Sequence, residues 1–304
     1  MLRCCITIVF VITSIFSVNG QTTVVLNPVK DNTIFQDATG NSNGAGVNIF
    51  AGNTANGSPR RALLKFDIAA QVPAGATITA VTLSLFCNKV NTSAVTNSVS
   101  IHPLLVDWGE GSSAAPASGD GAGVAATTND ATWVNRFHPS NAWTAPGGDF
   151  SSTASATTGV GGASASYSWT SPQVITEVQA WLNNPSTNFG WILIGAEASS
   201  GSAKRFSSRE NSVAAQRPQL SVTYIAPAAP TVFTFTGTGN WDVTTNWSNN
   251  TIPPANLAAN TEIIIDPPAT GECILNVPQT IQPGGKITVQ PNKKLTIAGN
   301  LIIQ

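Results

Sequence analysis

Arg61 and Lys65 are two basic side chains whose spacing would place them on one side of a β-strand. Residues 61–67 alternate in polarity, with Leu64 and Phe66 on the face that would point into a core. The same alternation directs Arg61 and Lys65 outward. Because guanidinium and ammonium groups bind carboxylates, this outward face suits an acidic ligand.

A second segment, residues 204–210, repeats the arrangement. Phe206 and Ser208 share its inward face, so Arg205 and Arg209 face outward. If the two segments lie on one face of a sheet, the four cations form a basic platform in a chain of which only 10% is charged. The alternative is that each cation pairs with a nearby carboxylate, for which the sequence offers Asp67, Glu197 and Glu210.

Aromatic side chains gather in a long segment, residues 109–165, which is rich in Gly, Ala, Ser and Thr. Trp133, His138 and Trp143 lie there without the alternation of a strand. Long loops are commonly functional, and aromatic faces line many ligand sites. These three residues are therefore a second set of candidate ligand contacts.

The sequence offers little for catalysis. It has no HExxH or GxSxG motif and no glycine-rich phosphate loop before a helix. Its two histidines are His102, in a predicted strand, and His138. Glycoside hydrolysis needs two carboxylates at a set separation, and the candidates are Glu110, Asp149, Glu197 and Glu210. Because most acids stand in structural motifs, we predict that the protein is not an enzyme.

Asp31 and Asp37 are candidate calcium ligands, because loops of jelly-roll domains offer the carboxylate and carbonyl oxygens that Ca²⁺ prefers. The alternative is that these side chains cap turns. The sequence has no CxxC or Cys/His cluster, which excludes a structural zinc site, and we expect no required cofactor. Cys87 and Cys273 fall in different predicted domains and are expected to be unpaired and buried.

The composition favours an all-β extracellular protein. Of the 304 residues, 42% are hydrophobic, which excludes wholesale disorder. The charged fraction lies well below the ~25% of an average globular protein, and the residues that usually cover helix surfaces are scarce. A net charge of −1 provides no attraction to nucleic acid or to anionic membranes.

The N-terminus has the three parts of a secretory signal peptide. Arg3 precedes an apolar run, residues 4–16, and small residues follow up to Gly20. The run is shorter than the ~20 residues that span a membrane. We therefore predict a signal peptide over residues 1–20. After its removal the chain should not insert into membranes, and it should be secreted or held at the cell surface.

Residues 21–225 are predicted to form a jelly-roll β-sandwich with one short helix. Short alternating segments are separated by Gly, Asn, Pro and Ser, as in many-stranded sandwiches. The helix should begin at Pro172, with Ser171 as its N-cap, and stop before Pro185. Residues 226–230, Ala-Pro-Ala-Ala-Pro, are a predicted linker.

Residues 231–304 are predicted to begin a β-solenoid. Pairs of apolar residues recur every six to eight positions, the repeat expected of solenoid strands. Because the pattern still runs at Gln304, we expect a truncated module with an uncovered apolar edge, and self-association through that edge. Trp241 and Trp247 are expected in the core of the module's N-terminal cap.

Several short motifs resemble those of the DNRLRE domain, a carbohydrate-binding-module-like β-sandwich of secreted bacterial proteins. They occur in the family's order over about two thirds of the chain, at Asp31-Asn32, 61–67, 72–79, 108–111, 131–133, 188–191, 206–210 and 218–224. The resemblance implies binding of polysaccharides, for some members acidic ones such as alginate. Family members often sit beside polysaccharide lyases or hydrolases, or within large adhesins.

These observations predict a secreted, non-catalytic carbohydrate-binding module whose partner is a polysaccharide, with an acidic one favoured by the basic side chains. The first alternative is a structural or adhesive cell-surface protein. The second is the binding fragment of a larger polysaccharide lyase or hydrolase.

Overall fold

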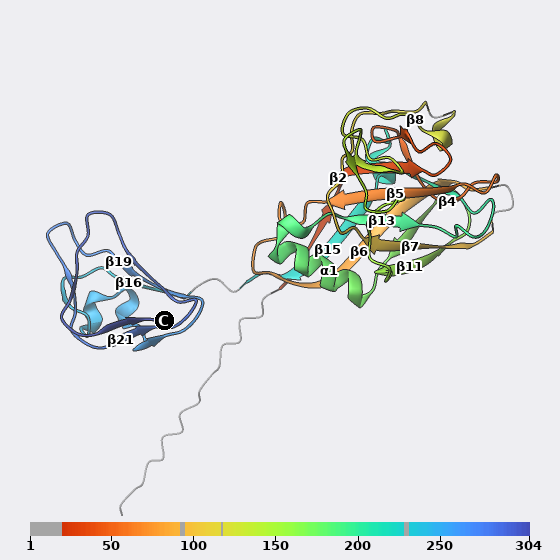
Figure 1. Ribbon diagram of the computed structural model, residues 1–304. Coiled ribbons are helices and arrows are strands. Elements are labelled where there is room, and N and C mark those ends of the chain that lie inside the picture. Colours follow the sequence, from red (N-terminus) through yellow and green to blue (C-terminus); the bar gives the residue numbers. More distant parts are fainter. Residues whose placement is uncertain (1–19, 92–94, 117, 228–230) are drawn as a thin grey trace, which may run out of the picture. The chain divides into compact units, whose positions relative to one another are not determined.

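The structure is a computed structural model that describes residues 20–91, 95–116, 118–227 and 231–304 (Figure 1). The chain divides into two compact units, residues 1–227 and 228–304. This division falls within the predicted linker, residues 226–230, of which the last three lie outside the described residues. The predicted signal peptide also lies outside them, except for Gly20.

Unit 1 is an antiparallel β-sandwich with one α-helix. An eleven-stranded curled sheet has the order β1-β15-β6-β14-β4-β5-β13-β7-β11, with β12 beside β6 and β2 beside β5. The all-β prediction with one short helix is confirmed. The strands are β1 (Gln21–Leu26), β2 (Pro28–Phe35), β3 (Asn41–Ser42), β4 (Asn48–Asn53), β5 (Pro59–Phe66), β6 (Thr77–Lys89), β7 (Asn97–Pro103), β8 (Val124–Ala125), β9 (Asn135–Phe137), β10 (Asn141–Ala142), β11 (Ala156–Val160), β12 (Ala165–Trp169), β13 (Trp191–Ile194), β14 (Lys204–Ser207) and β15 (Gln219–Ile225).

Strand β4 joins the two halves of the sandwich. Its first four residues pair with β14, whereas Gly52 and Asn53 pair with β5. The sheet therefore changes direction at β4, and its two halves enclose the main core. Alternation fills this core as predicted, with Leu64 and Phe66 from one half and Phe206 from the other.

A second apolar cluster covers the outer face of β5 and β13. Leu63 and Ile192 point away from the main core and pack with Trp108, Trp133 and Trp143 from the segment that follows β7. Both faces of this half-sheet are thus buried. The predicted loop 109–165 is shorter than expected, because β11 forms near its end and pairs with β7, and β12 begins at its last residue and pairs with β6.

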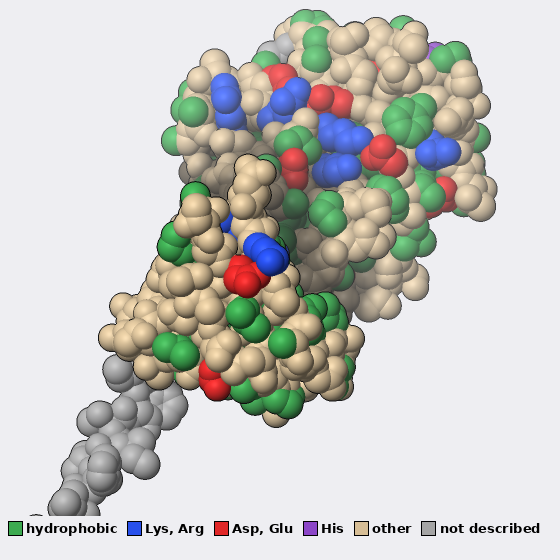
Figure 2. Space-filling model, turned by 90° about the vertical axis from the view of Figure 1, so that its left-hand side faces the viewer, with side chains coloured by type: hydrophobic (Ala, Val, Ile, Leu, Met, Phe, Trp, Pro, Cys, Tyr) green, Lys and Arg blue, Asp and Glu red, His purple; other side chains and the backbone are tan. Residues whose placement is uncertain are grey.

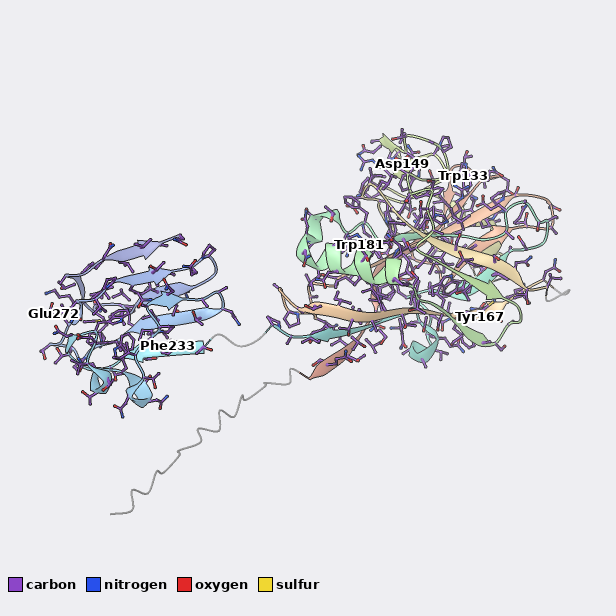
Figure 3. All side chains as sticks on the ribbon, turned by 90° about the horizontal axis from the view of Figure 1, so that it is seen from below. Trp133, Asp149, Tyr167, Trp181, Phe233 and Glu272 are labelled. Atoms are coloured by element: carbon purple, nitrogen blue, oxygen red, sulfur yellow. The ribbon has the colours of Figure 1, made fainter. Side chains whose placement is uncertain are left out.

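Helix α1 (Pro172–Asn183) begins as the sequence predicts. The Ser171 hydroxyl accepts a hydrogen bond from Val174 N at 3.1 Å, and Pro172 occupies the first turn. Trp181, which is labelled on α1 in Figure 3, packs against Trp191 with ring centres 4.6 Å apart, so it belongs to the core. Within the described residues, no helix is long and apolar enough to cross a membrane.

Short 3₁₀ helices occupy several turns of both units. One of them, η1, lies in the segment between β7 and β9. They are η1 (Asp120–Ala122), η2 (Pro185–Thr187), η3 (Ala214–Gln216), η4 (Thr244–Asn246) and η5 (Ser248–Asn250).

Unit 2 is a β-solenoid of three coils with three short strands each. Its parallel ladders join β16 to β19 to β22, β17 to β20 to β23, and β18 to β21 to β24. The predicted solenoid is confirmed, and each apolar pair in the sequence is one strand. The strands are β16 (Thr231–Phe235), β17 (Gly239–Asn240), β18 (Asn256–Leu257), β19 (Thr261–Ile265), β20 (Cys273–Leu275), β21 (Gln279–Ile281), β22 (Lys286–Val289), β23 (Leu295–Ile297) and β24 (Leu301–Ile303).

The solenoid core is built from side chains that stack in register. Phe233 pairs in register with Ile263, which pairs with Ile287 in the third coil, and all three belong to or pack against the core. Trp241 and Trp247 are buried in this core, as predicted, with ring centres 4.7 Å apart. The cysteines of both units, Cys87 and Cys273, are unpaired and buried.

Candidate functional site

Arg61 is held by its neighbours rather than presented to solvent. Its Nε and Nη2 donate to the two carboxylate oxygens of Glu197 at 2.7 and 2.8 Å, and Nη1 donates to the Gly147 carbonyl at 2.8 Å. The guanidinium carbon lies 4.8 Å from the ring centre of Trp133 and 5.3 Å from that of Phe150. Gly147 has φ +97°, and a Cβ there would lie 2.6 Å from Arg61 Nη1. Arg61 thus fastens the loop to the sheet.

Lys65 and Arg209 are also paired. Lys65 Nζ lies 3.8 Å from Asp107 Oδ1, and burial lowers the pKa of Lys65. Arg209 Nε lies 2.7 Å from Glu110 Oε1 and 2.8 Å from Glu210 Oε1. Acidic side chains lie beside basic ones on the face of unit 1 seen in Figure 2. The four predicted cations therefore do not form one unpaired platform.

The aromatic residues of the loop do not present open faces for a sugar ring. Trp133 and Trp143 are buried in the second cluster, and Trp143 Nε1 donates to the Thr132 carbonyl at 2.8 Å. His138 is half-buried, and its Nδ1 has no hydrogen-bond partner within the described part of the chain. The loop packs onto the sheet through the two indoles, so their burial has a structural explanation.

Asp31 and Asp37 contact different partners. Asp37 lies 2.8 Å from Arg60 Nη1, and the hydrogen bond and charge of Arg60 lower the pKa of Asp37 although burial acts against them. Asp31 is fully buried, and its Oδ2 accepts from Arg209 N at 2.7 Å. No group of three or more His, Cys, Asp or Glu side chains in the described ranges is arranged to hold a metal ion. Calcium binding stays a prediction.

The carboxylates considered for catalysis are engaged in the fold. Three pair with the arginines described above, and Asp149 accepts main-chain N–H groups from Thr144 and Ala145 at 2.9 and 3.2 Å. His102 Nδ1 lies 2.9 Å from the Ser151 carbonyl, as expected of a structural strand residue. Each of these side chains therefore has a structural role in the fold.

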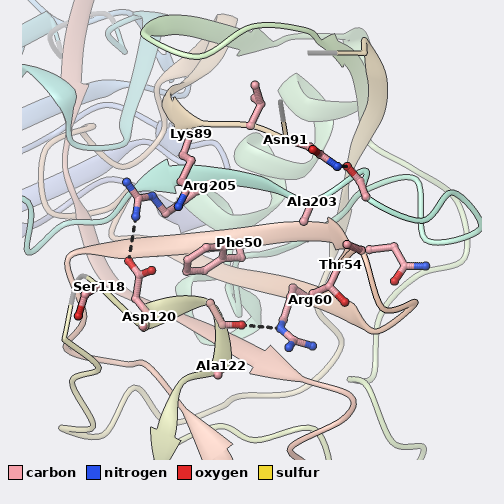
Figure 4. A pocket seen from close by; sticks show the side chains of 16 residues that line it. Phe50, Thr54, Arg60, Lys89, Asn91, Ser118, Asp120, Ala122, Ala203 and Arg205 are labelled. Atoms are coloured by element: carbon pink, nitrogen blue, oxygen red, sulfur yellow. Dashed lines mark hydrogen bonds and ion pairs between the residues drawn. The ribbon is translucent and has the colours of Figure 1, made fainter. Parts of the chain in front are cut away.

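The larger of the pockets described for unit 1 has a volume of about 530 Å³, within the usual range for small-ligand sites (Figure 4). It lies where β4, β6 and β14 meet the segment that carries η1. The lining residues are Phe50, Asn53, Thr54, Ala55, Arg60, Lys89, Val90, Asn91, Ser118, Gly119, Asp120, Gly121, Ala122, Gly201, Ala203 and Arg205.

One row of side chains across three strands forms part of the lining. Phe50 on β4 is the register partner of Arg205 on β14, and Arg205 is also the register partner of Lys89 on β6. Neighbouring strands lie ~4.8 Å apart, so these three side chains are neighbours. Figure 4 shows Lys89 and Arg205 together, with Phe50 beside them.

Lys89 and Arg205 are the two cations that this pocket offers to a ligand. The Lys89 side chain is exposed and forms no ion pair with any described residue. Arg205 Nε donates to Asn88 Oδ1 at 2.7 Å, while Nη1 lies 3.5 Å from Asp120 Oδ2, a long contact. The Arg205 guanidinium is thus oriented by one hydrogen bond and only weakly neutralised.

The opposite wall is fixed by buried contacts. Asp120 is buried and accepts from Asn48 Nδ2 at 2.6 Å, which anchors η1. Arg60 Nε donates to the Gly121 carbonyl at 2.9 Å, and its Nη1 pairs with Asp37. Arg60 therefore supports the wall and is not available to a ligand.

Sequence reasoning found Arg205 but missed Phe50 and Lys89. By strict alternation Lys89 shares the inward side of Cys87, yet a register shift between Arg205 and Phe206 redirects the end of β6. A bulge leaves no clear mark in this sequence. Phe50 carried a usable signal, because Ile49 and Ala51 face the core and alternation directs Phe50 outward.

No protein-family model matches this chain, and no curated protein matches it either. The resemblance to the DNRLRE domain therefore stays a hypothesis. The structure does bring together residues from three of the motifs that carry this resemblance. Hydrogen bonds, ion pairs and electrostatic interactions connect Asp31, Glu110, Arg209 and Glu210.

Proposed function

We propose that unit 1 binds an acidic polysaccharide, without catalysis, in the pocket formed by Phe50, Lys89 and Arg205. The observation that carries the proposal is the row of these side chains along one side of a 530 Å³ pocket. We further propose that the protein acts outside the cell, as the N-terminal sequence suggests.

The chemistry of the lining supports an acidic sugar. A uronate carboxylate would accept from the Lys89 ammonium and from the outer nitrogens of Arg205. Phe50 offers an apolar surface to the ring, although it is only 8% exposed. Thr54, Ser118 and other polar lining residues can bind the hydroxyl groups.

A neighbouring pocket supports a ligand longer than one sugar. It has a volume of about 230 Å³ and shares Asn91 and Gly201 with the first. Ser199 and Ser200 line it with exposed side chains that can form hydrogen bonds to a ligand. Shared walls suit a chain that continues from one pocket into the next.

The small number of carboxylate side chains in the pocket lining favours a binding role over hydrolysis. Asp120 is the one carboxylate in the described lining of the larger pocket, and it is buried and already accepts a hydrogen bond from Asn48 Nδ2. Glycosidases of the usual kind use two carboxylates that flank the scissile bond. The pocket therefore has cations for holding a substrate but lacks the acid pair for cleaving one.

Calorimetry with defined oligosaccharides tests this function. The protein should bind oligouronates but not neutral glucans of equal length, and its affinity for oligouronates should fall as salt rises, because exposed charges are screened over ~8–10 Å at physiological ionic strength. Equal binding of neutral and acidic chains would contradict the proposal. Binding of neither would favour the structural or adhesive alternative. Release of shortened products would show that the protein is an enzyme.

A further inference from the structure

Lys204, the first residue of β14, is a buried lysine without an acidic partner. It is only 2% exposed, and it forms no ion pair with any described carboxylate. The other lysines are either paired with an acid or, like Lys89, exposed. Because lysine is almost never buried without a partner, a charged group from outside the chain is the natural complement of Lys204.

Alternation along β14 directs this lysine into the sandwich. Phe206 lies in the main core, and Lys204, two residues earlier, shares its side of the strand. Lys204 Nζ donates to the Val95 carbonyl at 2.7 Å and to the Gly161 carbonyl at 3.4 Å. Val95 precedes β7 and Gly161 follows β11, two paired strands of the other half-sheet. The ammonium therefore bridges the two halves at one end of the sandwich.

These two contacts leave the ammonium of Lys204 incompletely satisfied. It has three N–H donors, whereas the described residues supply two acceptors, both uncharged and one at a long distance. Burial lowers the pKa of Lys204, because water no longer stabilises its positive charge. An anion beside Nζ would supply the missing acceptor and would favour the charged form again.

The smaller of the two pockets described above provides space for such an anion. Its volume of about 230 Å³ is several times the ~30 Å³ of one water molecule, so it can admit a small organic acid. Lys204 is the one charged residue in its described lining, so no carboxylate of that lining repels an anion. The other lining residues are Asn91, Val95, Asn97, Ser199, Ser200, Gly201 and Ser202.

The serine wall of this pocket is fixed by the fold. Gly201 N donates to the Thr54 carbonyl at 3.0 Å, and Ser202 Oγ accepts from Asn53 N at 3.0 Å. These bonds fasten the segment between β13 and β14 to the end of β4. Ser199 remains exposed, and its hydroxyl can contact the rest of a ligand. The pocket is therefore preformed, as small-molecule sites usually are.

We propose that the smaller pocket is a carboxylate-binding site in which Lys204 Nζ donates to a carboxylate oxygen of a small organic acid. The ligand provides the countercharge that the fold does not provide. With an oligouronate, the site holds the carboxylate of the sugar next to the one bound at Lys89 and Arg205. This extension rests on the function proposed above, whereas the carboxylate site itself does not.

Calorimetry with glucuronate and its neutral analogue glucuronamide tests the carboxylate site. The double variant Lys89→Ala with Arg205→Ala lacks the cations of the larger pocket, so its binding reports the smaller one. It should bind glucuronate at least ~10-fold more tightly than glucuronamide, the difference expected of a charge-assisted hydrogen bond. Adding Lys204→Met should remove this preference. Adding Lys65→Met instead, which removes a cation elsewhere in unit 1, should retain it.

Equal affinity of the double variant for glucuronate and glucuronamide, or binding of neither, would overturn the proposal. This comparison leaves Lys204 in place, so it stands even if Lys204→Met does not fold. An unchanged preference after Lys204→Met would also overturn the proposal. So would competition by sulfate that equals competition by acetate at the same ionic strength, because the site would then not select carboxylates.

A second titration separates the carboxylate site from the proposed function. The unmodified protein should bind a diuronate more tightly than the same disaccharide with one carboxylate converted to an amide, and Lys204→Met should abolish this difference. If the larger pocket does not bind polysaccharide, oligouronate affinity will not depend on Lys89 and Arg205. The preference of the double variant for glucuronate over glucuronamide will persist in that case.

Discussion

The two units stabilise charged side chains in different ways. In unit 2 the three lysines all lie in the third coil, and each pairs with an acid of the second coil: Lys286 with Glu262, Lys293 with Asp266, and Lys294 with Glu272. In unit 1 the partners come from distant segments, such as Arg61 with Glu197. In the solenoid, ion pairs form between neighbouring coils of the repeat. In the sandwich, they form between strands and loops that are distant in sequence.

This difference also concerns accessibility. The side chains of Lys286 and Lys294 are 67% and 68% exposed, whereas that of Arg61 is 16% exposed. An ion pair with an exposed lysine contributes little to the free energy of unfolding, because water solvates the lysine well when the pair is broken. Arg61 forms a bidentate pair with Glu197 that is largely shielded from solvent, and its guanidinium also contacts the Gly147 carbonyl and two aromatic rings. This pair is therefore part of the packing of unit 1.

The first prediction is that Arg61→Ala destabilises unit 1. The variant leaves Glu197 without its guanidinium and removes the ring contacts to Trp133 and Phe150, so the free energy of unfolding should fall by about 2 kcal/mol. Chemical denaturation followed by tryptophan fluorescence measures this change.

Lys286→Ala in the solenoid is the matched comparison. It removes an exposed cation, and Glu262 keeps the hydrogen bond from Thr288 Oγ1 at 2.6 Å, so the Tm should change by less than ~1 °C. If the two variants have equal effects, the contrast between sheltered and exposed pairs is wrong.

The next prediction concerns the outward edge of the third coil. The strands β22, β23 and β24 each pair on one side only within the described residues, and Ile297 and Ile303 are 52% and 68% exposed. We expect the protein to self-associate through this edge, since unpaired apolar strands are templates for another chain. Ile297→Lys combined with Ile303→Lys should weaken association at least ~10-fold, a change of about 1.4 kcal/mol.

Sedimentation of both proteins at the same concentrations measures this effect. Two monomers over the whole range would remove the proposed interface. The sandwich provides the control. Val25 on β1 and Val29 on β2 are also exposed, but they do not belong to the open coil of the solenoid, so Val29→Lys should leave association unchanged.

Local patterns predicted the elements of the fold well. The solenoid could be predicted because its repeat is written along the chain, with each apolar pair forming one strand. Ser171 and Pro172 marked the start of α1 because capping depends on neighbouring residues. Alternation correctly assigned Leu64 and Phe66 to the core.

The candidate site was harder to predict, because it depends on which strands become neighbours. Nothing local shows that Phe50, Lys89 and Arg205 share a row, since β4 and β6 reach β14 from opposite sides. Alternation shows that Arg61 leaves the main core, but it does not show that a loop covers the outer face. For the same reason, the sequence does not show that Trp133 is buried against this face instead of being open to a sugar.

The most direct test of the account is the affinity of the protein for an oligouronate when the pocket cations are removed. Lys89→Ala combined with Arg205→Ala should weaken binding at least ~10-fold, the loss expected when charge-assisted hydrogen bonds are removed, while the Tm stays within a few degrees. The control, Lys65→Ala, removes a cation outside the pocket and should bind as the unmodified protein does. Unchanged affinity in the double variant, or a loss equal to that of Lys65→Ala, would contradict binding in this pocket.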